Sequence, residues 1–457
     1  MELNNKRVLV VGLGKSGLAA AMFLRDKGAR VTVSDSRSMA ALEKEIPSLL
    51  DAGIAVEAGG HGLLTFRRQD LIVVSPGVPY NTPELQKTRA LNIPGLEIIG
   101  EVELASRFLQ GRIVAITGSN GKTTTTALTA KIFTDAGLPT LIGGNIGTPV
   151  IDLIPRSMPE TWSVLEVSSF QLETIARFRP HISVVLNITP DHLDRHGSFE
   201  NYAAAKARIT ENQTAEDFLV LNAEDKPTQM VATKTLAQIF WFSPRRPIKQ
   251  GAFVHGESIA FLAREGGKAE PIMPVAEIPL KGAHNVENVL AAICAARLAG
   301  ISAESIRQSI RTFQAVEHRL EFVATVRGIS FYNDSKATNV DATKKALEAF
   351  PSGIHLILGG KDKDSDYTEL ADLICARVKT VYTIGSAAEK IARQLDRATK
   401  IVSAGTLDAA VRTAAQDAAA GDLVLLAPAC ASFDQFENYE HRGRVFKQLV
   451  TELLANG

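Results

Sequence analysis

The chain has few cysteines and no excess of charge of either sign. Its 457 residues include three cysteines, Cys294, Cys375 and Cys430. Their odd number and wide spacing fit neither a disulfide framework nor a zinc-binding cluster, and they are typical of a reducing compartment. Lys plus Arg and Asp plus Glu both number 50, so no overall field favours nucleic acid or an anionic membrane. Small molecules are therefore the expected partners, and nucleic acid is not.

The sequence also lacks long apolar runs, low-complexity segments and short internal repeats. No apolar run has the length that a bilayer-spanning helix needs. The opening residues, MELNNKRVLVVG, lead directly into an apolar strand, without a charged leader and a separate apolar stretch. We therefore expect no stable membrane insertion and a cytoplasmic location, and we expect the chain to act as a monomer.

Apolar runs rich in Val, Ile and Leu alternate with amphipathic helical stretches along the whole chain. This alternation is typical of parallel sheets covered by helices on both faces, so the expected fold class is α/β. The length exceeds what one hydrophobic core organises, and three domains are expected. They are an N-terminal Rossmann-like unit over residues 1–102, a central P-loop-type ATPase unit with a parallel sheet over 103–314, and a C-terminal Rossmann-like unit over 315–457. Weakly patterned residues 239–278 predict a small antiparallel element inside the central unit.

A phosphate-binding loop is predicted directly after one of these apolar segments. Gly118 and Gly121 allow a tight turn whose N–H groups point inward, and the helix that follows adds the positive end of its dipole. Lys122 can reach phosphate oxygens, and Thr123 can offer its hydroxyl to magnesium. Ile116 stands where the first glycine of the general Walker pattern belongs, but strand, turn, lysine, hydroxyl and helix follow in the required order. A chance glycine turn is the less favoured alternative.

A second glycine-rich turn follows the first apolar strand. Its residues 12–17, GLGKSG, and Asp35 at the end of the next strand have the spacing of a dinucleotide-binding Rossmann unit. The literal interpretation is an NAD-dependent dehydrogenase, which has no need of the phosphate loop at Lys122. A nucleotide-linked substrate uses the same geometry, with Asp35 and Arg37 near its base or ribose and its diphosphate near the glycines. We favour that substrate and keep the dehydrogenase as an alternative.

Two residues of the central unit, Glu166 and His192, suggest metal chemistry, whereas a third, Lys206, does not by itself. Glu166 ends a strand where the second acidic strand of a P-loop ATPase holds magnesium, although a solvated strand-end carboxylate is the alternative. His192 lies in a loop with two aspartates and a second histidine, which either cap the loop or bind a metal. Lys206 belongs to an expected helix over residues 199–209, and composition alone predicts a solvated surface lysine there.

Polar residues also gather after the later strands. Asn285 and Asn288 stand near the start of an apolar helix, where amides cap the helix or bind a purine. The segments 333–339, NDSKATN, and 359–363, GGKDK, each follow an expected strand. Because the carboxyl ends of parallel strands share one edge of a sheet, their hydroxyls, amides and lysines suit an anionic substrate that carries carboxylates. Solvated surface loops are the alternative.

Seven motifs together resemble one protein family. TGSNGKTTT, LEVSSFQLE, NITPDHLDRHG, the helix that carries Lys206, HNVEN, EHR and NDSKATN occur in the order found in the Mur ligases of peptidoglycan synthesis, and they cover nearly the full chain. LGGKDK and ACASFDQF further resemble the branch that adds D-glutamate. The resemblance implies a ligase of cell wall biogenesis, and so of cell shape and division. It implies that ATP and two Mg2+ ions support the joining of D-glutamate to UDP-N-acetylmuramoyl-L-alanine through an acyl phosphate.

The resemblance also implies a role for each matching residue. The catalytic residues would be Lys122, Glu166, His192 and Lys206. Thr123 and Glu166 would hold the first magnesium ion. His192 and a carbamylated Lys206 would hold the second, because a carbamate is an anion whereas an ammonium group repels a metal. The implied binding residues are, for ATP, Gly118, Ser119, Asn120, Gly121, Lys122, Thr123, Thr124, Asn285, Asn288, Arg319, Asp334 and Lys336; for the UDP-linked substrate, Ser16, Asp35, Ser36, Arg37, Ser75, Gly77, Asn145, Ser168, Gln171 and His192; and for D-glutamate, Thr338, Lys363, Ser432, Phe433 and Tyr439.

Two other functions stand as alternatives beside the ligase and the dehydrogenase. Folylpolyglutamate synthase shares a similar phosphate loop and also adds glutamate, but an N-terminal unit with its own glycine turn argues against it. A nucleotide sensor without turnover would have no need of a second metal site at His192 and Lys206. Because the ligase substrates would bind between three domains, we also expect the domains to close on binding and to exclude water from the acyl phosphate.

Overall fold

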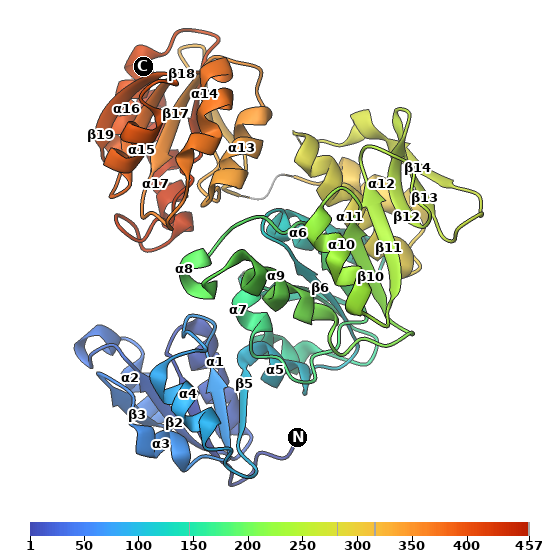
Figure 1. The fold of residues 1–457 in the computed structure, drawn as a ribbon, viewed down its shortest axis with the longest axis vertical. Helices are drawn as coiled ribbons and strands as arrows, with labels where there is room; N and C mark the ends of the chain where they lie inside the picture. Colours follow the sequence, from blue (N-terminus) through green and yellow to red (C-terminus); the bar gives the residue numbers. More distant parts are fainter. Residues whose placement is uncertain (146, 281, 315–316, 456–457) are drawn as a thin grey trace.

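The computed structural model describes residues 1–145, 147–280, 282–314 and 317–455. The chain forms three sheets in succession (Figure 1), with buried apolar clusters around them. This arrangement confirms the expected α/β class. The proposed boundary at residue 102 falls within helix α5 (Glu101–Ser106). The proposed boundary between residues 314 and 315 adjoins positions 315–316, which lie outside the described residues.

The N-terminal sheet is parallel, with the strand order β3-β2-β1-β4-β5. Its central strand β1 buries residues 8–11 completely, because apolar clusters cover both faces of the sheet. The first glycine turn joins β1 to helix α1. The elements are β1 (Arg7–Val11), α1 (Lys15–Asp26), β2 (Arg30–Asp35), α2 (Ile46–Asp51), β3 (Ala55–Ala58), α3 (Leu63–Arg67), β4 (Leu71–Val74), α4 (Pro83–Ala90) and β5 (Glu97–Gly100).

The middle sheet has the strand order β14-β13-β12-β11-β10-β9-β6-β8-β7. The predicted antiparallel element is confirmed for β12, β13 and β14, which extend the edge of the main sheet. The prediction is wrong for β11, which lies in the same segment but pairs parallel with β10. The elements are β6 (Arg112–Thr117), α6 (Lys122–Asp135), β7 (Thr140–Gly144), η2 (Val150–Arg156), β8 (Trp162–Glu166), α7 (Ser169–Leu172), β9 (Ile182–Val185), α8 (Leu193–His196), α9 (Phe199–Ala207), β10 (Phe218–Asn222), α10 (Lys226–Val231), β11 (Gln238–Ser243), β12 (Gly251–His255), β13 (Ser258–Leu262), β14 (Glu270–Pro274), α11 (Ala283–Leu298) and α12 (Ala303–Arg311).

The C-terminal sheet has the strand order β15-β16-β20-β17-β18-β19. Its strands are parallel except for the edge strand β15, which pairs antiparallel with β16. The sequence pattern did not predict β15. The elements are β15 (Glu321–Val326), β16 (Ile329–Asn333), α13 (Val340–Glu348), β17 (Ile354–Gly359), α14 (Ala371–Arg377), β18 (Val378–Ile384), α15 (Ala388–Leu395), β19 (Lys400–Gly405), α16 (Leu407–Asp417), β20 (Leu423–Leu426) and α17 (Tyr439–Ala455).

The loops at the carboxyl ends of the parallel strands converge on one space. Loops after β1, β2 and β4, after β6, β8 and β9, and after β16 all contribute to a common cleft, as expected for open parallel sheets. Cys294 is buried in α11 and belongs to the apolar core of the middle domain. In the part of the chain that the structure describes, no helix combines the length and the apolar character needed to cross a membrane.

Candidate active site

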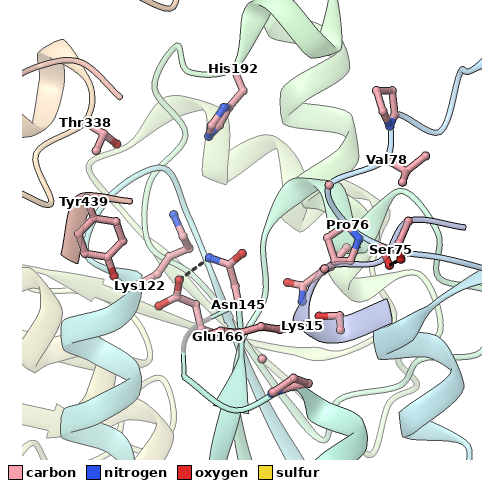
Figure 2. Close-up of a pocket in the computed structure, with 18 of the residues that line it drawn as sticks. Lys15, Ser75, Pro76, Val78, Lys122, Asn145, Glu166, His192, Thr338 and Tyr439 are labelled. Carbon is pink, nitrogen blue, oxygen red and sulfur yellow. Dashed lines mark hydrogen bonds between the residues drawn. The ribbon is translucent and has the colours of Figure 1, made fainter. Parts of the chain in front are cut away.

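A cleft of about 860 Å³ is lined by residues from all three domains. In Figure 2, Thr338 and Tyr439 of the C-terminal domain stand on one side of this cleft, and Ser75 and Pro76 of the N-terminal domain stand on the other. Glu166 of the middle domain lies between them. Residues that are distant in the sequence are therefore brought around one space by the way the three sheets face one another.

The loop after β6 has the geometry of a phosphate cradle. Gly121 adopts φ +86°, and a Cβ there would lie 2.2 Å from Asn288 Oδ1, so the position requires glycine. Lys122 Nζ donates to the carbonyl oxygens of Gly118 and Ser119 at 2.8 and 2.9 Å. Burial lowers the pKa of Lys122. The amine thus lies over its own loop, where the oxygens of a bound phosphate would replace the carbonyl oxygens.

Glu166, at the end of β8, joins the phosphate loop to the loop after β7. Thr123 Oγ1 donates to Glu166 Oε2 at 2.7 Å, and Asn145 Nδ2 donates to Glu166 Oε1 at 2.8 Å, the bond dashed in Figure 2. Burial by itself would raise the pKa of Glu166, but the charges of Lys336 and Lys122 hold it below its ordinary range. An ionised carboxylate and a hydroxyl form an oxygen donor set of the kind that Mg2+ prefers. Thr123 and Glu166 therefore fit the first ion.

Lys206 is buried, so the surface position predicted from composition is wrong. The residue is 1% exposed, and its Nζ donates to the carbonyl oxygen of Gly118 at 2.8 Å. Burial, reinforced by the charge of Lys122, lowers the pKa of Lys206 well below its ordinary value. Carbon dioxide adds to a neutral amine, so this environment favours the form of Lys206 that carbamylation requires.

His192 occupies the turn before α8 in a left-handed conformation, with φ 54°. Burial lowers the pKa of its imidazole to about 3, against the opposing charge of Asp191. The ring is therefore neutral and can offer a nitrogen lone pair to a metal. His192 and Lys206 line the same pocket, and a carbamate on Lys206 would add an anionic oxygen. The pair fits a second ion in the carbamylated form.

The predicted UDP subsite is organised around Asp35. Asp35 Oδ2 accepts the N–H of Leu13 at 2.7 Å and an Nη2 hydrogen bond from Arg37 at 3.0 Å. Burial opposes ionisation, but these hydrogen bonds keep the pKa of Asp35 below its ordinary value. Ser75 Oγ donates to the carbonyl oxygen of Gly12 at 2.7 Å, which joins the glycine turn to the loop after β4. The predicted residues that line the cleft are Ser16, Asp35, Ser36, Arg37, Ser75, Gly77, Asn145, Gln171 and His192.

A capping interaction at the start of α7 orients the side chains of Ser168 and Gln171. The backbone N–H of Ser168 donates to Gln171 Oε1 at 2.9 Å, and the N–H of Gln171 donates to Ser168 Oγ at 3.3 Å. Gln171 lines the main cleft, whereas Ser168 lines the pocket beside it. Lys15 and His61 also line the cleft, although neither was predicted. Lys15 stood in the glycine motif, but no local pattern marked His61.

The predicted ATP residues meet beside the phosphate loop. Asn285 and Thr124 are buried, and among the described residues they lie behind those that line the cleft and the two smaller pockets beside it. Asn285 Oδ1 accepts Asn288 Nδ2 at 2.9 Å and so orients that amide. Burial raises the pKa of Asp334 to about 6, against the charge of Arg319 at 3.7 Å. The predicted ATP residues that do line this region are Ser119, Asn120, Gly121, Lys122, Thr123, Asn288, Arg319, Asp334 and Lys336.

A pocket of about 350 Å³ adjoins the cleft and contains every residue predicted for D-glutamate. Lys336 Nζ donates to the Tyr439 hydroxyl at 3.1 Å, and burial lowers the pKa of Lys336 to about 8. Phe433 is 67% exposed and therefore lies at the rim of the pocket. The lining residues include Lys122, Asn145, Ser168, His192, Lys206, Thr338, Lys363, Ser432, Phe433 and Tyr439.

The sequence did not predict the hydrogen bonds and the ion pair that connect the C-terminal domain to the middle domain. Asp191 Oδ2 accepts Asn339 Nδ2 at 3.0 Å, and Asp191 Oδ1 lies 3.3 Å from Lys363 Nζ. Burial opposes the charge on Asp191, but Lys363 helps to hold its pKa at about 2. Asn120 Nδ2 donates to Asp341 Oδ2 at 2.5 Å. Several of these residues stood inside the quoted motifs, but only the tertiary contact gives them a bridging role.

The family of the chain follows from comparison with known proteins. Residues 6–100 match the N-terminal domain described as Mur ligase MurD-like. Residues 116–296 match the Mur ligase middle domain, and residues 318–430 match the domain described as Mur ligase, glutamate ligase domain. The chain belongs to the Mur ligase family.

Similar proteins extend over the whole chain. A UDP-N-acetylmuramoylalanine--D-glutamate ligase from Acidobacterium capsulatum is 67% identical over 450 residues, which cover 98% of this chain and 97% of that protein. A protein of the same name from Koribacter versatilis is 59% identical over 453 residues, 99% of each chain. The solved structure of UDP-N-acetylmuramate-alanine ligase from Thermotoga maritima has a TM-score of 0.61 and 19% identity, covering 98% of this chain and 100% of its own. At that identity, the likeness shows the fold alone.

Proposed function

We propose that the chain is an ATP-dependent ligase that joins D-glutamate to the alanine carboxylate of UDP-N-acetylmuramoyl-L-alanine, in the cytoplasmic synthesis of peptidoglycan precursors. One observation carries the proposal. A phosphate loop, a nucleotide-binding glycine turn and a lysine-containing pocket suited to carboxylates all lie around one cleft. Full-length relatives that are named for this reaction support it.

The order of steps follows from the chemistry of a carboxylate, which is a poor electrophile. Transfer of the terminal phosphoryl group of ATP to the alanine carboxylate gives an acyl phosphate and ADP. The amine of D-glutamate then attacks the acyl carbon, the tetrahedral intermediate loses phosphate, and the amide forms. Lys122 offsets negative charge on the phosphoryl group, because its amine lies at the phosphate loop.

Two magnesium sites are part of the proposal. Thr123 and Glu166 would hold one ion, and His192 with carbamylated Lys206 would hold the other. When bound, such ions neutralise charge on the transferring phosphoryl group. The low pKa of Glu166 and the neutral state favoured for Lys206 support these assignments.

The D-glutamate pocket supplies cations and hydroxyls for carboxylates. Lys363 would pair with a glutamate carboxylate, while Thr338 and Ser432 would donate hydrogen bonds. Asp191 lies beside Lys363 and keeps its ammonium group at the domain boundary. We propose that the enzyme works as a monomer, whose domains close around the substrates and exclude water from the acyl phosphate.

The test is ADP release by the purified protein with magnesium, ATP and UDP-N-acetylmuramoyl-L-alanine. D-glutamate, L-glutamate, L-alanine and diaminopimelate are compared as the added amine, with reactions that lack each substrate as controls. Release that requires D-glutamate is expected. Release with a different amine would keep the reaction class but overturn the pocket assignment, and no release with any amine would overturn the proposed ligase.

A further inference from the structure

Arg195 connects the N-terminal domain to the loop that carries His192. It lies in α8, three residues after that histidine. Its Nη1 donates to the carbonyl oxygen of Pro76 at 2.9 Å, and its Nη2 donates to that of Val78 at 3.0 Å. Both acceptors belong to the loop after β4, which also carries Ser75 of the proposed UDP subsite. Figure 2 shows this loop on one wall of the cleft and His192 projecting from another.

The same guanidinium also contacts the histidine through an aromatic ring. Arg195 Cζ lies 3.8 Å from the centroid of the Phe170 ring. Phe170 in turn meets His192 edge to face, with the centroids 4.8 Å apart, and stacks on His196 at 5.4 Å. A continuous series of contacts therefore runs from the loop after β4, through Arg195 and Phe170, to His192.

The backbone of His192 needs such support. Its φ of 54° is uncommon for a residue with a side chain, and such a conformation persists where the surroundings hold it. The carbonyl oxygen of His192 accepts the N–H groups of Arg195 and His196 at 3.1 and 3.0 Å. The turn and the arginine side chain thus constrain the same residue from two directions.

Lysine cannot reproduce this arrangement. The Arg195 side chain is 15% exposed, and its closest anionic partner is Glu173 at 3.5 Å. Its two planar Nη groups reach two carbonyl oxygens at once while the guanidinium face covers a ring, whereas an ammonium group is a compact point donor. The guanidinium is therefore shaped for a bridge between elements rather than for a simple ion pair.

We propose that Arg195 is a positioning residue, which couples the substrate-binding loop of the N-terminal domain to the placement of His192. The inference rests on the proposed function, because it takes His192 as a ligand of the second metal ion and the loop after β4 as part of the UDP subsite. Occupation of that loop by the UDP-linked substrate then steadies the His192 turn through Arg195.

The first test compares Arg195→Lys with the wild-type enzyme in the D-glutamate-dependent ADP assay. We expect kcat to fall at least tenfold, while the KM values for ATP and D-glutamate change less than threefold. Arg208→Lys is the matched control, because Arg208 also donates to backbone carbonyl oxygens, those of Leu172, Glu173 and Ile175, but within the middle domain. Its kcat should remain within twofold of the wild-type value.

The second test measures coupling without turnover. Amide hydrogen exchange of residues 189–197 is followed with and without UDP-N-acetylmuramoyl-L-alanine. We expect the substrate to slow exchange in the wild-type protein and in Arg208→Lys, but not in Arg195→Lys at equal occupancy. Protection that survives in Arg195→Lys would overturn the coupling.

The outcomes separate this inference from the proposed function. If the wild-type protein releases no ADP with D-glutamate, the proposed function fails. If the wild-type protein turns over and Arg195→Lys keeps kcat within twofold, only the role of Arg195 fails. Should Arg195→Lys not fold, Phe170→Leu interrupts the same series of contacts without touching the carbonyl bonds. It should then lower kcat with little change in the KM for ATP, and an unchanged kcat would overturn the proposal.

Discussion

Glu101 should make the folded protein less stable as the pH rises from 5 to 8. The residue lies in α5, between the first two sheets, and is 1% exposed. Its Oε1 accepts the N–H of Ile151 at 2.8 Å, while its Oε2 has no hydrogen-bond partner among the described residues. Burial, reinforced by the charge of Asp152, raises the pKa of Glu101 from 4.5 to about 7. The fold therefore favours the protonated carboxyl.

The size of this loss of stability follows from proton linkage. The folded chain binds this proton more tightly than the unfolded chain, so the destabilisation is absent below about pH 4.5 and grows as the pH rises toward 7. A pKa raised from 4.5 to about 7 corresponds to ~3 kcal/mol once Glu101 is ionised in both states. In a unit of 150–250 residues, such an energy corresponds to roughly 6–12 °C in the melting temperature.

Glu101→Gln removes the titration and keeps an acceptor for the N–H of Ile151. We expect its melting temperature to lie within about 3 °C of the wild-type value at pH 5 and to exceed it by roughly 6–12 °C at pH 8. Differential scanning calorimetry at the two pH values measures the difference. A difference that is the same at both pH values would refute the reasoning, because only a titrating carboxyl makes it depend on pH.

Glu103 in the same helix provides the control. Its Oε2 accepts three backbone N–H groups, of residues 176–178, each at 2.9 Å, and its Oε1 accepts Arg107 Nε at 2.7 Å. Glu103→Gln removes the charge from a fully paired carboxylate, and we expect it to destabilise the protein by about 3 kcal/mol at both pH values. The two substitutions are chemically identical, so opposite effects at pH 8 would separate a buried carboxyl with one hydrogen-bonded oxygen from one that is ion-paired and fully hydrogen-bonded.

Three further changes test the site. Lys206→Ala should lower the rate of ADP release about a hundredfold or more. Short-chain carboxylic acids should restore part of that rate. Carbamylation would be contradicted if no acid restored activity and the ¹³C NMR spectrum of the wild-type protein showed no carbamate signal. Asp191→Asn should raise the KM for D-glutamate about tenfold, a loss of ~1.4 kcal/mol, because Lys363 loses its anionic partner. Steady-state kinetics at saturating ATP measure this KM. An unchanged KM would exclude a role of Asp191 in holding Lys363 for D-glutamate. Gly121→Ala should abolish ATP binding in titration calorimetry, because its Cβ would lie 2.2 Å from Asn288 Oδ1.

Matched controls exist for two of these changes. Gly137 has φ +80° at the end of α6, but a Cβ there meets nothing within 4 Å. Gly137→Ala should therefore cost some stability and leave ATP binding intact; equal loss of binding in both glycine variants would point to a general folding defect. Lys131→Ala removes a partly exposed lysine that pairs with Asp135, and its activity should match that of the wild-type protein.

Strands with continuous apolar runs could be predicted closely from the sequence. The apolar runs 218–222 and 423–426 form β10 and β20, because burial on both faces requires apolar side chains at successive positions. β15 was missed because it is an antiparallel edge strand with a single buried residue, Val326, and its apolar pattern is correspondingly weak. The segment 239–278 was only partly predicted, since short strands do not reveal from their own residues whether their partners run parallel or antiparallel.

In the site, too, some features could be predicted from the sequence and others could not. Motif residues such as Thr123 and Glu166 were predicted because each follows a recognisable strand, and the structure joins them by a hydrogen bond. The burial of Lys206 could not be predicted, because the side chains that exclude water from it come from distant segments. The bond between Asp191 and Asn339 joins residues 148 positions apart, across two domains. No local pattern specifies such a distance.

The sequence by itself determined the α/β class, the two glycine turns, the phosphate loop and the family to which the chain belongs. These properties depend on neighbouring residues, whose backbone conformations, apolar periodicity and hydrogen bonds are local. Only the tertiary structure decided which strand ends share a cleft, that Lys206 is buried with a lowered pKa, that Glu101 Oε2 is buried without a hydrogen-bond partner in the described residues, and that Arg195 reaches the loop after β4. Those properties depend on the packing of whole domains, because burial and electrostatic environment are set by every segment that surrounds a group.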